Sequence, residues 1–184
     1  ASKSRGLGDV YKRQAVKDGK ILKIGDISED AKESYDAKNQ TVLPGCIDTQ
    51  THFREPGSTD TEDLNSGSRA AVAGGITAVF EMPNTNPPTS NIKEFQRKLD
   101  LAKNRMYCNY AFYFGATADN VSQLAELKNL EGCCGIKLFA GSSTGNLLVA
   151  DEKDIDKVFQ NSSKVVAVHS EDCLLYTSDA ADDW

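Results

Sequence analysis

Apolar and polar positions follow two different rhythms along the chain, and the change falls near residue 45. Before it, short strand-like pieces occupy 15–19, 20–25 and 41–44, with Asp18-Gly19 as a hairpin signal. After it, apolar runs at 45–49, 76–82, 108–115, 134–139 and 164–169 alternate with amphipathic segments at 61–73, 91–104, 120–130 and 152–160. The first amphipathic segment has Asp60 or Thr61 as its cap and Gly74-Gly75 as its stop. The pattern therefore predicts strands joined by helices.

Short buried strands that alternate with helices are typical of parallel βα units, so the predicted fold class is α/β. Such units build either a doubly wound sheet or a (β/α)₈ barrel, which takes about 250 residues. No G-x-G-x-x-G follows the first strand, which disfavours a dinucleotide-binding sheet. Polar residues gather at the carboxyl ends of the strands, where barrel enzymes carry their chemistry. We therefore expect a partial barrel of about five βα units.

The two ends depart from the pattern of the body. Residues 9–14 (DVYKRQ) can be written in codons whose reverse complement, read one base along, encodes residues 173–178 (CLLYTS). This inverted repeat resembles the translated adapters of transposon-based sequencing libraries. We therefore expect 1–14 and 173–184 to be artefacts that take no part in the fold. The expected domains are then 15–45 and 46–172, as an internal piece of a longer protein that is inactive by itself.

Composition narrows the class of protein. Across 184 residues, 27 acidic side chains outnumber 21 basic ones, for a net charge of −6. With no basic cluster and no apolar run of about 18 residues, neither nucleic acid nor a membrane is an expected partner. The five cysteines show no C-x-x-C spacing and no disulfide framework. These features indicate a reduced, cytoplasmic protein.

Chemistry-bearing side chains follow the first apolar run. Gln50, His52 and Arg54 alternate, so in an extended chain they point the same way. A metal could bind His52 while a substrate carboxylate binds Arg54. Alternatively, His52 bonds a carbonyl and Arg54 pairs with Glu55. The spacing leaves both interpretations open.

Three further polar residues stand at the ends of later strands. Asn84 lies in a proline-rich turn, which by itself explains an asparagine. Lys137 interrupts an apolar run, where an unpaired ammonium is costly unless its head reaches solvent. His169 ends the fifth strand, so both histidines of the chain fall at strand ends.

These motifs together resemble a known family. Residues 48–57 (DTQTHFREPG) resemble the D-x-H-x-H-F-R-E-P-G signature of the dihydroorotases, a branch of the cyclic amidohydrolases. Residues 69–77 (RAAVAGGIT), 81–85 (EMPNT), 135–139 (GIKLF) and 168–172 (VHSED) resemble the following blocks in family order. The resemblance covers essentially all of 15–172. It implies a partial (β/α)₈ barrel preceded by part of a small β-sandwich.

The resemblance also implies a function. It is that of a metal-dependent hydrolase that interconverts L-dihydroorotate and N-carbamoyl-L-aspartate in pyrimidine biosynthesis. Carried over by position, His52 and His169 ligate one or two zinc ions, and Lys137 bridges them after carbamylation by CO₂. Arg54 and Asn84 hold the substrate carboxylate. The family's general-base aspartate is expected beyond residue 172, and a homodimer or a complex with aspartate carbamoyltransferase is the implied assembly.

Gln50 departs from the family pattern, which has histidine at this place. An amide is a weaker zinc ligand than an imidazole, so Gln50 is an uncertain metal ligand. Two alternatives to a dihydroorotase are left open, and Gln50 raises the second. One is a dihydropyrimidinase or allantoinase, which shares the fold and the metal site. The other is a non-catalytic dihydroorotase-like subunit that binds aspartate carbamoyltransferase.

Overall fold

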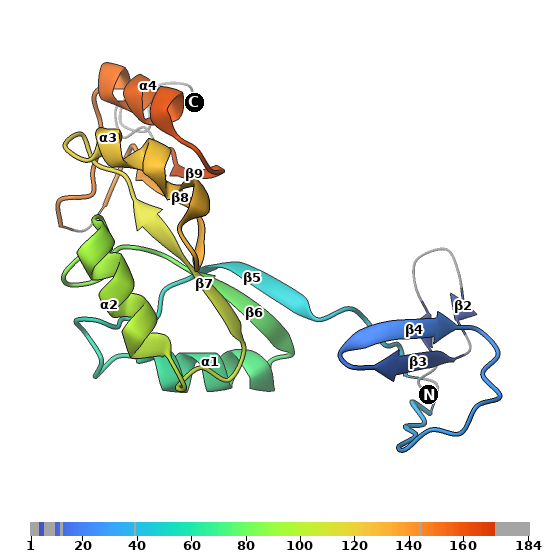
Figure 1. The fold of residues 1–184 in the computed structure, drawn as a ribbon. Helices are drawn as coiled ribbons and strands as arrows, with labels where there is room; N and C mark the ends of the chain where they lie inside the picture. Colours follow the sequence, from blue (N-terminus) through green and yellow to red (C-terminus); the bar gives the residue numbers. More distant parts are fainter. Residues whose placement is uncertain (1–3, 6–9, 12, 39, 144, 172–184) are drawn as a thin grey trace, which may run out of the picture. The chain divides into compact units, whose positions relative to one another are not determined.

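The structure, a computed structural model, describes all residues except 1–3, 6–9, 12, 39, 144 and 172–184. The artefact expected at 173–184 lies outside the described residues, as does much of 1–14. The chain divides into two compact units, Ala1–Gly45 and Cys46–Trp184. Figure 1 shows the elements of each unit.

The first unit is a small antiparallel element. Strands β1 (Ser4–Arg5) and β2 (Val10–Tyr11) pair with each other, and β3 (Gln14–Lys17) pairs with β4 (Lys20–Ile24). The predicted hairpin turn is confirmed, because Asp18 and Gly19 both adopt positive φ, 51° and 73°. The strand predicted at 41–44 is wrong, since this stretch is irregular. Pro44 has no N–H to donate to a ladder.

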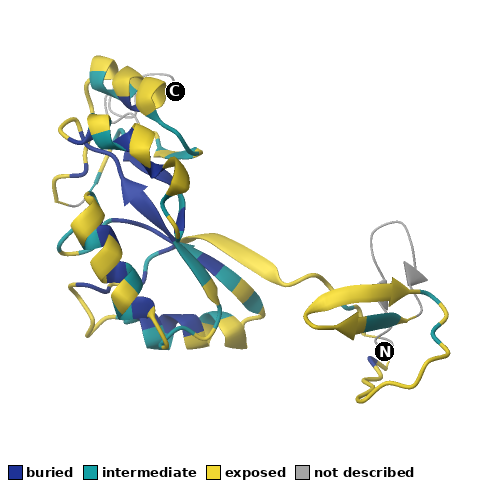
Figure 2. Cartoon of the chain, in the orientation of Figure 1, coloured by how far each residue is buried: buried dark blue, intermediate teal, exposed yellow. Residues whose placement is uncertain are grey.

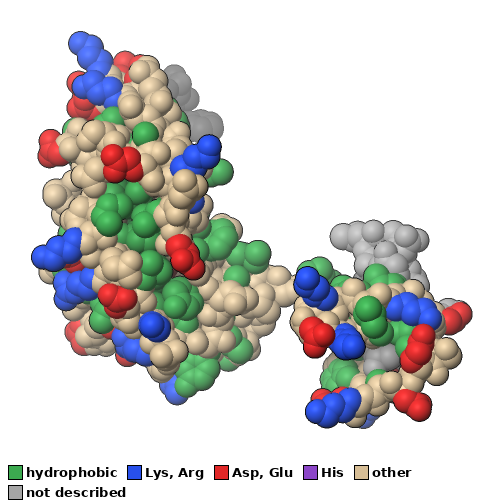
Figure 3. Space-filling model, viewed as in Figure 1, with side chains coloured by type: hydrophobic (Ala, Val, Ile, Leu, Met, Phe, Trp, Pro, Cys, Tyr) green, Lys and Arg blue, Asp and Glu red, His purple; other side chains and the backbone are tan. Residues whose placement is uncertain are grey.

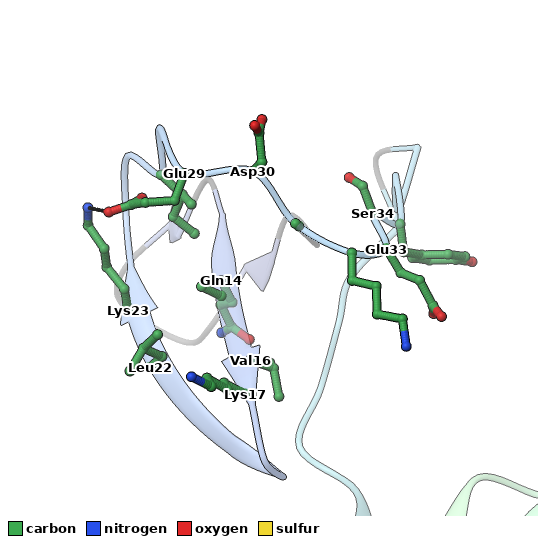
Figure 4. A pocket seen from close by; sticks show the side chains of 14 residues that line it. Gln14, Val16, Lys17, Leu22, Lys23, Glu29, Asp30, Glu33 and Ser34 are labelled. Atoms are coloured by element: carbon green, nitrogen blue, oxygen red, sulfur yellow. Dashed lines mark hydrogen bonds and ion pairs between the residues drawn. The ribbon is translucent and has the colours of Figure 1, made fainter.

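One side of this hairpin is open. A hollow of about 1040 Å³ lies between the hairpin and residues 27–35, and Figure 4 shows the ion pair of Lys23 with Glu29 at its rim. Val16 and Leu22 line it, with exposed fractions of 64% and 70%. A two-stranded hairpin with its apolar side chains in water is marginal by itself.

The second unit confirms the predicted alternation of strands and helices. Its five strands form one parallel sheet in sequence order: β5 (Cys46–Thr51), β6 (Ile76–Glu81), β7 (Asn109–Gly115), β8 (Cys133–Phe139) and β9 (Val166–His169). Helices α1 (Leu64–Ala73), α2 (Ile92–Ala102), α3 (Val121–Leu124) and α4 (Glu152–Asn161) and the 3₁₀ helix η1 (Ala125–Asn129) connect them. Figure 1 shows the helices flanking a curled sheet, as in part of a barrel.

Helix α1 begins later than its sequence suggested. Neither Asp60 nor Thr61 caps it, because Asp63 and Ser66 form a reciprocal capping box. The Asp63 carboxylate accepts from the Ser66 N–H at 2.6 Å, and the Ser66 hydroxyl accepts from the Asp63 N–H at 3.1 Å. A reciprocal pair satisfies two backbone donors, which a single threonine or aspartate at 60–61 would not.

The helix predicted over 120–130 divides into α3 and η1. Its apolar side chains recur every three residues, at Val121, Leu124, Leu127 and Leu130. Side chains spaced by three eclipse each other in a 3₁₀ helix, whereas they drift around an α-helix. The tighter helix keeps Leu124 and Leu127 fully buried.

The core lies between the helices and the middle strands. Phe95 of α2 packs against Phe112 and Phe114 of β7, with ring centroids 6.4 Å apart in both pairs. Figure 2 shows buried residues along β7 and β8, whereas most of β5 is exposed. The four described cysteines are free thiols, and none of the described helices is long and apolar enough to cross a membrane. Figure 3 shows acidic and basic side chains interspersed on the visible face.

Candidate functional site at the carboxyl ends of the strands

The sheet brings the predicted site residues to one edge. His52 follows β5 directly, and Asn84 comes three residues after β6. Lys137 lies in β8, two residues before its end, and His169 is the last residue of β9. Parallel strands expose their carboxyl ends on the same side, so the topology gathers these side chains at one mouth.

His52 is half-buried and held by a side chain. Its Nδ1 lies 3.0 Å from Oδ1 of Asn84. Burial lowers the pKa of His52, and the positive charges of Arg54, Lys137 and Lys98 lower this pKa further, against the Asn84 hydrogen bond. Lys137 therefore lies close enough to His52 to act on it electrostatically.

Asn84 belongs to a tightly bonded loop. The carbonyl of Pro83 accepts from the N–H groups of Thr85 and Thr89, both at 2.9 Å. The Asn86 N–H donates to the carbonyl of Pro56 at 2.9 Å and so ties this loop to the loop after β5. The turn expected from the prolines is present, and it aims the Asn84 amide at His52.

Arg54 is exposed and lines a pocket of about 460 Å³. The other lining residues come from the two loops and from a third segment: Pro56, Ser58, Asn84, Thr85, Asn86, Pro88 and Gly145. The proposed pairing of Arg54 with Glu55 is wrong. Glu55 instead makes a bidentate pair with Arg105, at 2.6 and 3.0 Å, and accepts from the Leu64 N–H.

One interpretation of the sequence placed the ammonium of Lys137 in solvent. The structure contradicts it. The residue is 3% exposed, and its Nζ lies 5.0 Å from the centroid of the Phe139 ring. Burial lowers the pKa of Lys137, and none of the described carboxylates forms an ion pair with it. A buried amine without a described carboxylate partner is the unusual feature of this mouth.

His169 and Gln50 lie at the periphery. The Nε2 of His169 lies 3.3 Å from a carboxylate oxygen of Glu171, and its ring contacts that of Phe139, with centroids 6.1 Å apart. Gln50 is exposed on β5, and its backbone N–H donates to Asp48. Within the described residues, no cluster of three or more His, Cys, Asp or Glu side chains is set to hold a metal ion.

A buried ion pair under the mouth escaped the sequence analysis. Glu81, the last residue of β6, pairs with Lys98 of α2, and both are fully buried. Lys98 also donates to the carbonyl of Met82 at 3.0 Å. Burial raises the pKa of Glu81 to about 8, against the pull of Lys98. The available signal was a lysine within the apolar stripe of an amphipathic helix, next to Phe95, Leu99 and Ala102.

Comparison with known proteins identifies the family of this chain. Residues 41–167 match the model of the amidohydrolase family. The chain belongs to this family. It is 37% identical over 162 residues to a dihydroorotase of Methanosarcina mazei and 37% identical over 162 residues to an allantoinase of Rubrobacter xylanophilus. Each alignment covers 85% of this chain, but only 35% and 36% of the two relatives.

A solved structure supports the fold. The L-hydantoinase (dihydropyrimidinase) of Arthrobacter aurescens superposes with a TM-score of 0.80 at 27% identity, over 93% of this chain and 39% of that one. The partial-barrel fold is thereby confirmed. The chain spans little more than a third of the length of these relatives. Because the identity to the dihydroorotase equals that to the allantoinase, the comparisons do not distinguish between their substrates. The substrate has to be inferred from the residues of the site.

Proposed function

We propose that the whole protein is a cyclic amidohydrolase that acts as a dihydroorotase. The observation that carries the proposal is the joint position of Arg54 and Asn84 in one pocket, with Asn84 bonded to His52. A guanidinium binds a carboxylate through two parallel hydrogen bonds, and an amide N–H adds a third. Dihydroorotate is a cyclic amide with a carboxylate, and it suits a pocket of about 460 Å³.

The donor set fits a zinc site. His52 is a half-buried imidazole with one nitrogen already bonded to Asn84, so the other is available to a metal. Lys137 is a buried amine with no described carboxylate beside it. Addition of its Nζ to CO₂ with loss of a proton would make an anion there. We propose that His52, His169 and carbamylated Lys137 hold one or two zinc ions.

Each residue of the chain then has a role. Bound zinc would supply a Lewis acid and an activated water for attack on the ring amide. Arg54 and Asn84 orient the substrate by its carboxylate, so that the amide carbonyl faces the histidines. Glu55, fixed by Arg105, keeps the loop of Arg54 in place. A general-base aspartate would come from a later part of the whole protein.

Two alternatives have an observation in their favour. Allantoinase or dihydropyrimidinase activity is favoured by the equal identity to an allantoinase and by the likeness to a hydantoinase. A non-catalytic subunit that binds aspartate carbamoyltransferase is favoured by Gln50, an amide where the family has histidine. Zinc content separates this subunit from the enzymes, because it should bind none.

The decisive experiment compares substrates with and without the carboxylate. The whole protein should open dihydroorotate, and Arg54→Ala should weaken binding of dihydroorotate by about 2–5 kcal/mol, because a charge-assisted bidentate contact is lost. Dihydrouracil has the same ring without the carboxylate, so its KM should not change in this variant.

The exposed Arg69 of α1 provides the charge-matched control, since Arg69→Ala should leave the KM for dihydroorotate unchanged. Unaltered dihydroorotate binding in Arg54→Ala, or turnover of allantoin alone, would reject the dihydroorotase assignment.

A further inference from the structure

Asn84 contacts His52 and also lines the neighbouring pocket. Its Oδ1 lies 3.0 Å from Nδ1 of His52. The same side chain lines the pocket that contains Arg54. The amide therefore stands between a histidine and the pocket that would receive an anion.

The direction of this hydrogen bond fixes the proton on the imidazole. A carbonyl oxygen can only accept, so the bond requires Nδ1 of His52 to carry the hydrogen. In a neutral imidazole the other nitrogen, Nε2, then has a free lone pair. A metal binds a histidine through such a lone pair.

We propose that Asn84 is a positioning residue for His52, which holds the Nδ1–H tautomer through its carbonyl and presents its NH₂ group to the anion bound by Arg54. This inference deepens the proposed function and rests on it for the identity of the anion. One amide thereby couples substrate recognition to the orientation of a metal ligand. The role is distinct from that of a carboxylate clamp alone, which would need no contact with His52.

The surroundings of Asn84 keep its backbone in place. Lys98 donates to the carbonyl of Met82 from below, and the Pro83 carbonyl accepts two backbone N–H groups. The Asn86 N–H reaches the loop after β5. Since these bonds involve only groups of this chain, the amide is oriented before any ligand binds. Pre-organised support of this kind is what makes a hydrogen bond to a metal ligand effective.

The tautomer can be observed directly in the chain. It has two histidines, so nitrogen-15 NMR of the 184-residue chain resolves both rings, and His169→Gln assigns His52. At about pH 8.5 the His52 ring is neutral, because burial lowers its pKa below the ordinary value of a histidine. We expect His52 in the Nδ1–H form, and a shift toward Nε2–H in Asn84→Ala. Asn86→Ala removes a neighbouring side-chain amide of the same pocket but keeps the backbone bond to Pro56, so it should leave the tautomer unchanged. An Nε2–H tautomer in the unaltered chain would overturn the inference.

Zinc affinity provides the second readout, in the whole protein. Asn84→Ala should lower zinc affinity by about 10–100-fold, the usual effect of removing a partner of a metal-bound histidine. Asn84→Asp keeps an acceptor for Nδ1–H, so it should retain zinc affinity while losing dihydroorotate binding through charge repulsion. Wild-type zinc affinity in Asn84→Ala would refute the positioning role and leave the proposed function standing. A wild-type protein that binds no zinc would refute the proposed function, whereas the tautomer in the chain would still decide the role of Asn84.

Discussion

Two corners of the same mouth are built in opposite ways. The first corner, at the ends of β5 and β6, holds His52, Arg54 and Asn84, and bonds within the chain fix it. Glu55 pairs with Arg105, Glu81 with Lys98, and Asn84 with His52. The second corner, at the ends of β8 and β9, holds Lys137 and His169. There a buried amine lies over an aromatic ring, and a half-exposed histidine faces Glu171.

The difference teaches which part of the site the chain completes by itself. Every buried charge of the first corner has an opposite charge, so that corner needs no ligand to be stable. Lys137 has no carboxylate partner among the described residues, so the second corner is stabilised only when something else supplies negative charge. The proposed recognition half is therefore pre-formed, while the proposed metal-binding half depends on a ligand.

Among the substitutions proposed here, we expect Lys98→Met to destabilise the first corner most. Above the Glu81 pKa of about 8, the change leaves the buried carboxylate of Glu81 without its cation, and we expect a loss of about 3–5 kcal/mol in the free energy of unfolding at such a pH. Urea denaturation of the chain measures it. The double variant Glu81→Leu with Lys98→Met removes both charges and should recover most of the loss. A small effect of the single change would mean that Glu81 has another partner.

Gly141→Ala tests how closely the two strands of the second corner must approach. A Cβ at Gly141 would overlap the backbone of Glu171, just beyond β9. Because backbone cannot yield as a side chain does, we expect a loss of about 1–3 kcal/mol and a changed environment of His169 in NMR spectra. Gly74→Ala is the control, since its Cβ would meet no atom closer than 3.5 Å. Equal stability of both variants would show that the segments separate without cost.

Lys137→Met is the matching substitution in the second corner. We expect its effect on the free energy of unfolding to have the opposite sign to that of Lys98→Met. Without metal, removal of the unpaired ammonium should stabilise the chain by about 1 kcal/mol, despite the lost contact with Phe139. Urea denaturation in EDTA measures this effect beside Lys98→Met. Destabilisation by Lys137→Met under these conditions would contradict the view that its ammonium lacks a partner.

Local pattern was enough to predict the five parallel strands and most helices, but not the irregular stretch at 41–44. The apolar runs around Val79, Phe112 and Leu138 are buried, as short parallel strands require. The exact starts of helices were less predictable, because the capping box of Asp63 and Ser66 competed with two earlier caps. The spacing of three residues between Leu124 and Leu127 suits a 3₁₀ helix, but the sequence alone did not show that both side chains would be buried on one side.

The partners within the site were beyond the reach of local pattern. Glu55 and Arg105 are 50 residues apart, and His52 and Asn84 are 32 apart. The sequence left open a pairing of Arg54 with Glu55, and it gave no means to find Arg105 as the partner of Glu55. The resemblance to a family named Asn84 as a carboxylate ligand, and only the fold revealed its contact with His52. Such pairs depend on how strands align in the sheet.

The sheet order β5-β6-β7-β8-β9 follows the order of synthesis. Each strand pairs with the one made just before it, so contacts are short in sequence and can form while the chain leaves the ribosome. All partners of the first corner lie between Cys46 and Arg105. These pairs can therefore form before Lys137 has been translated.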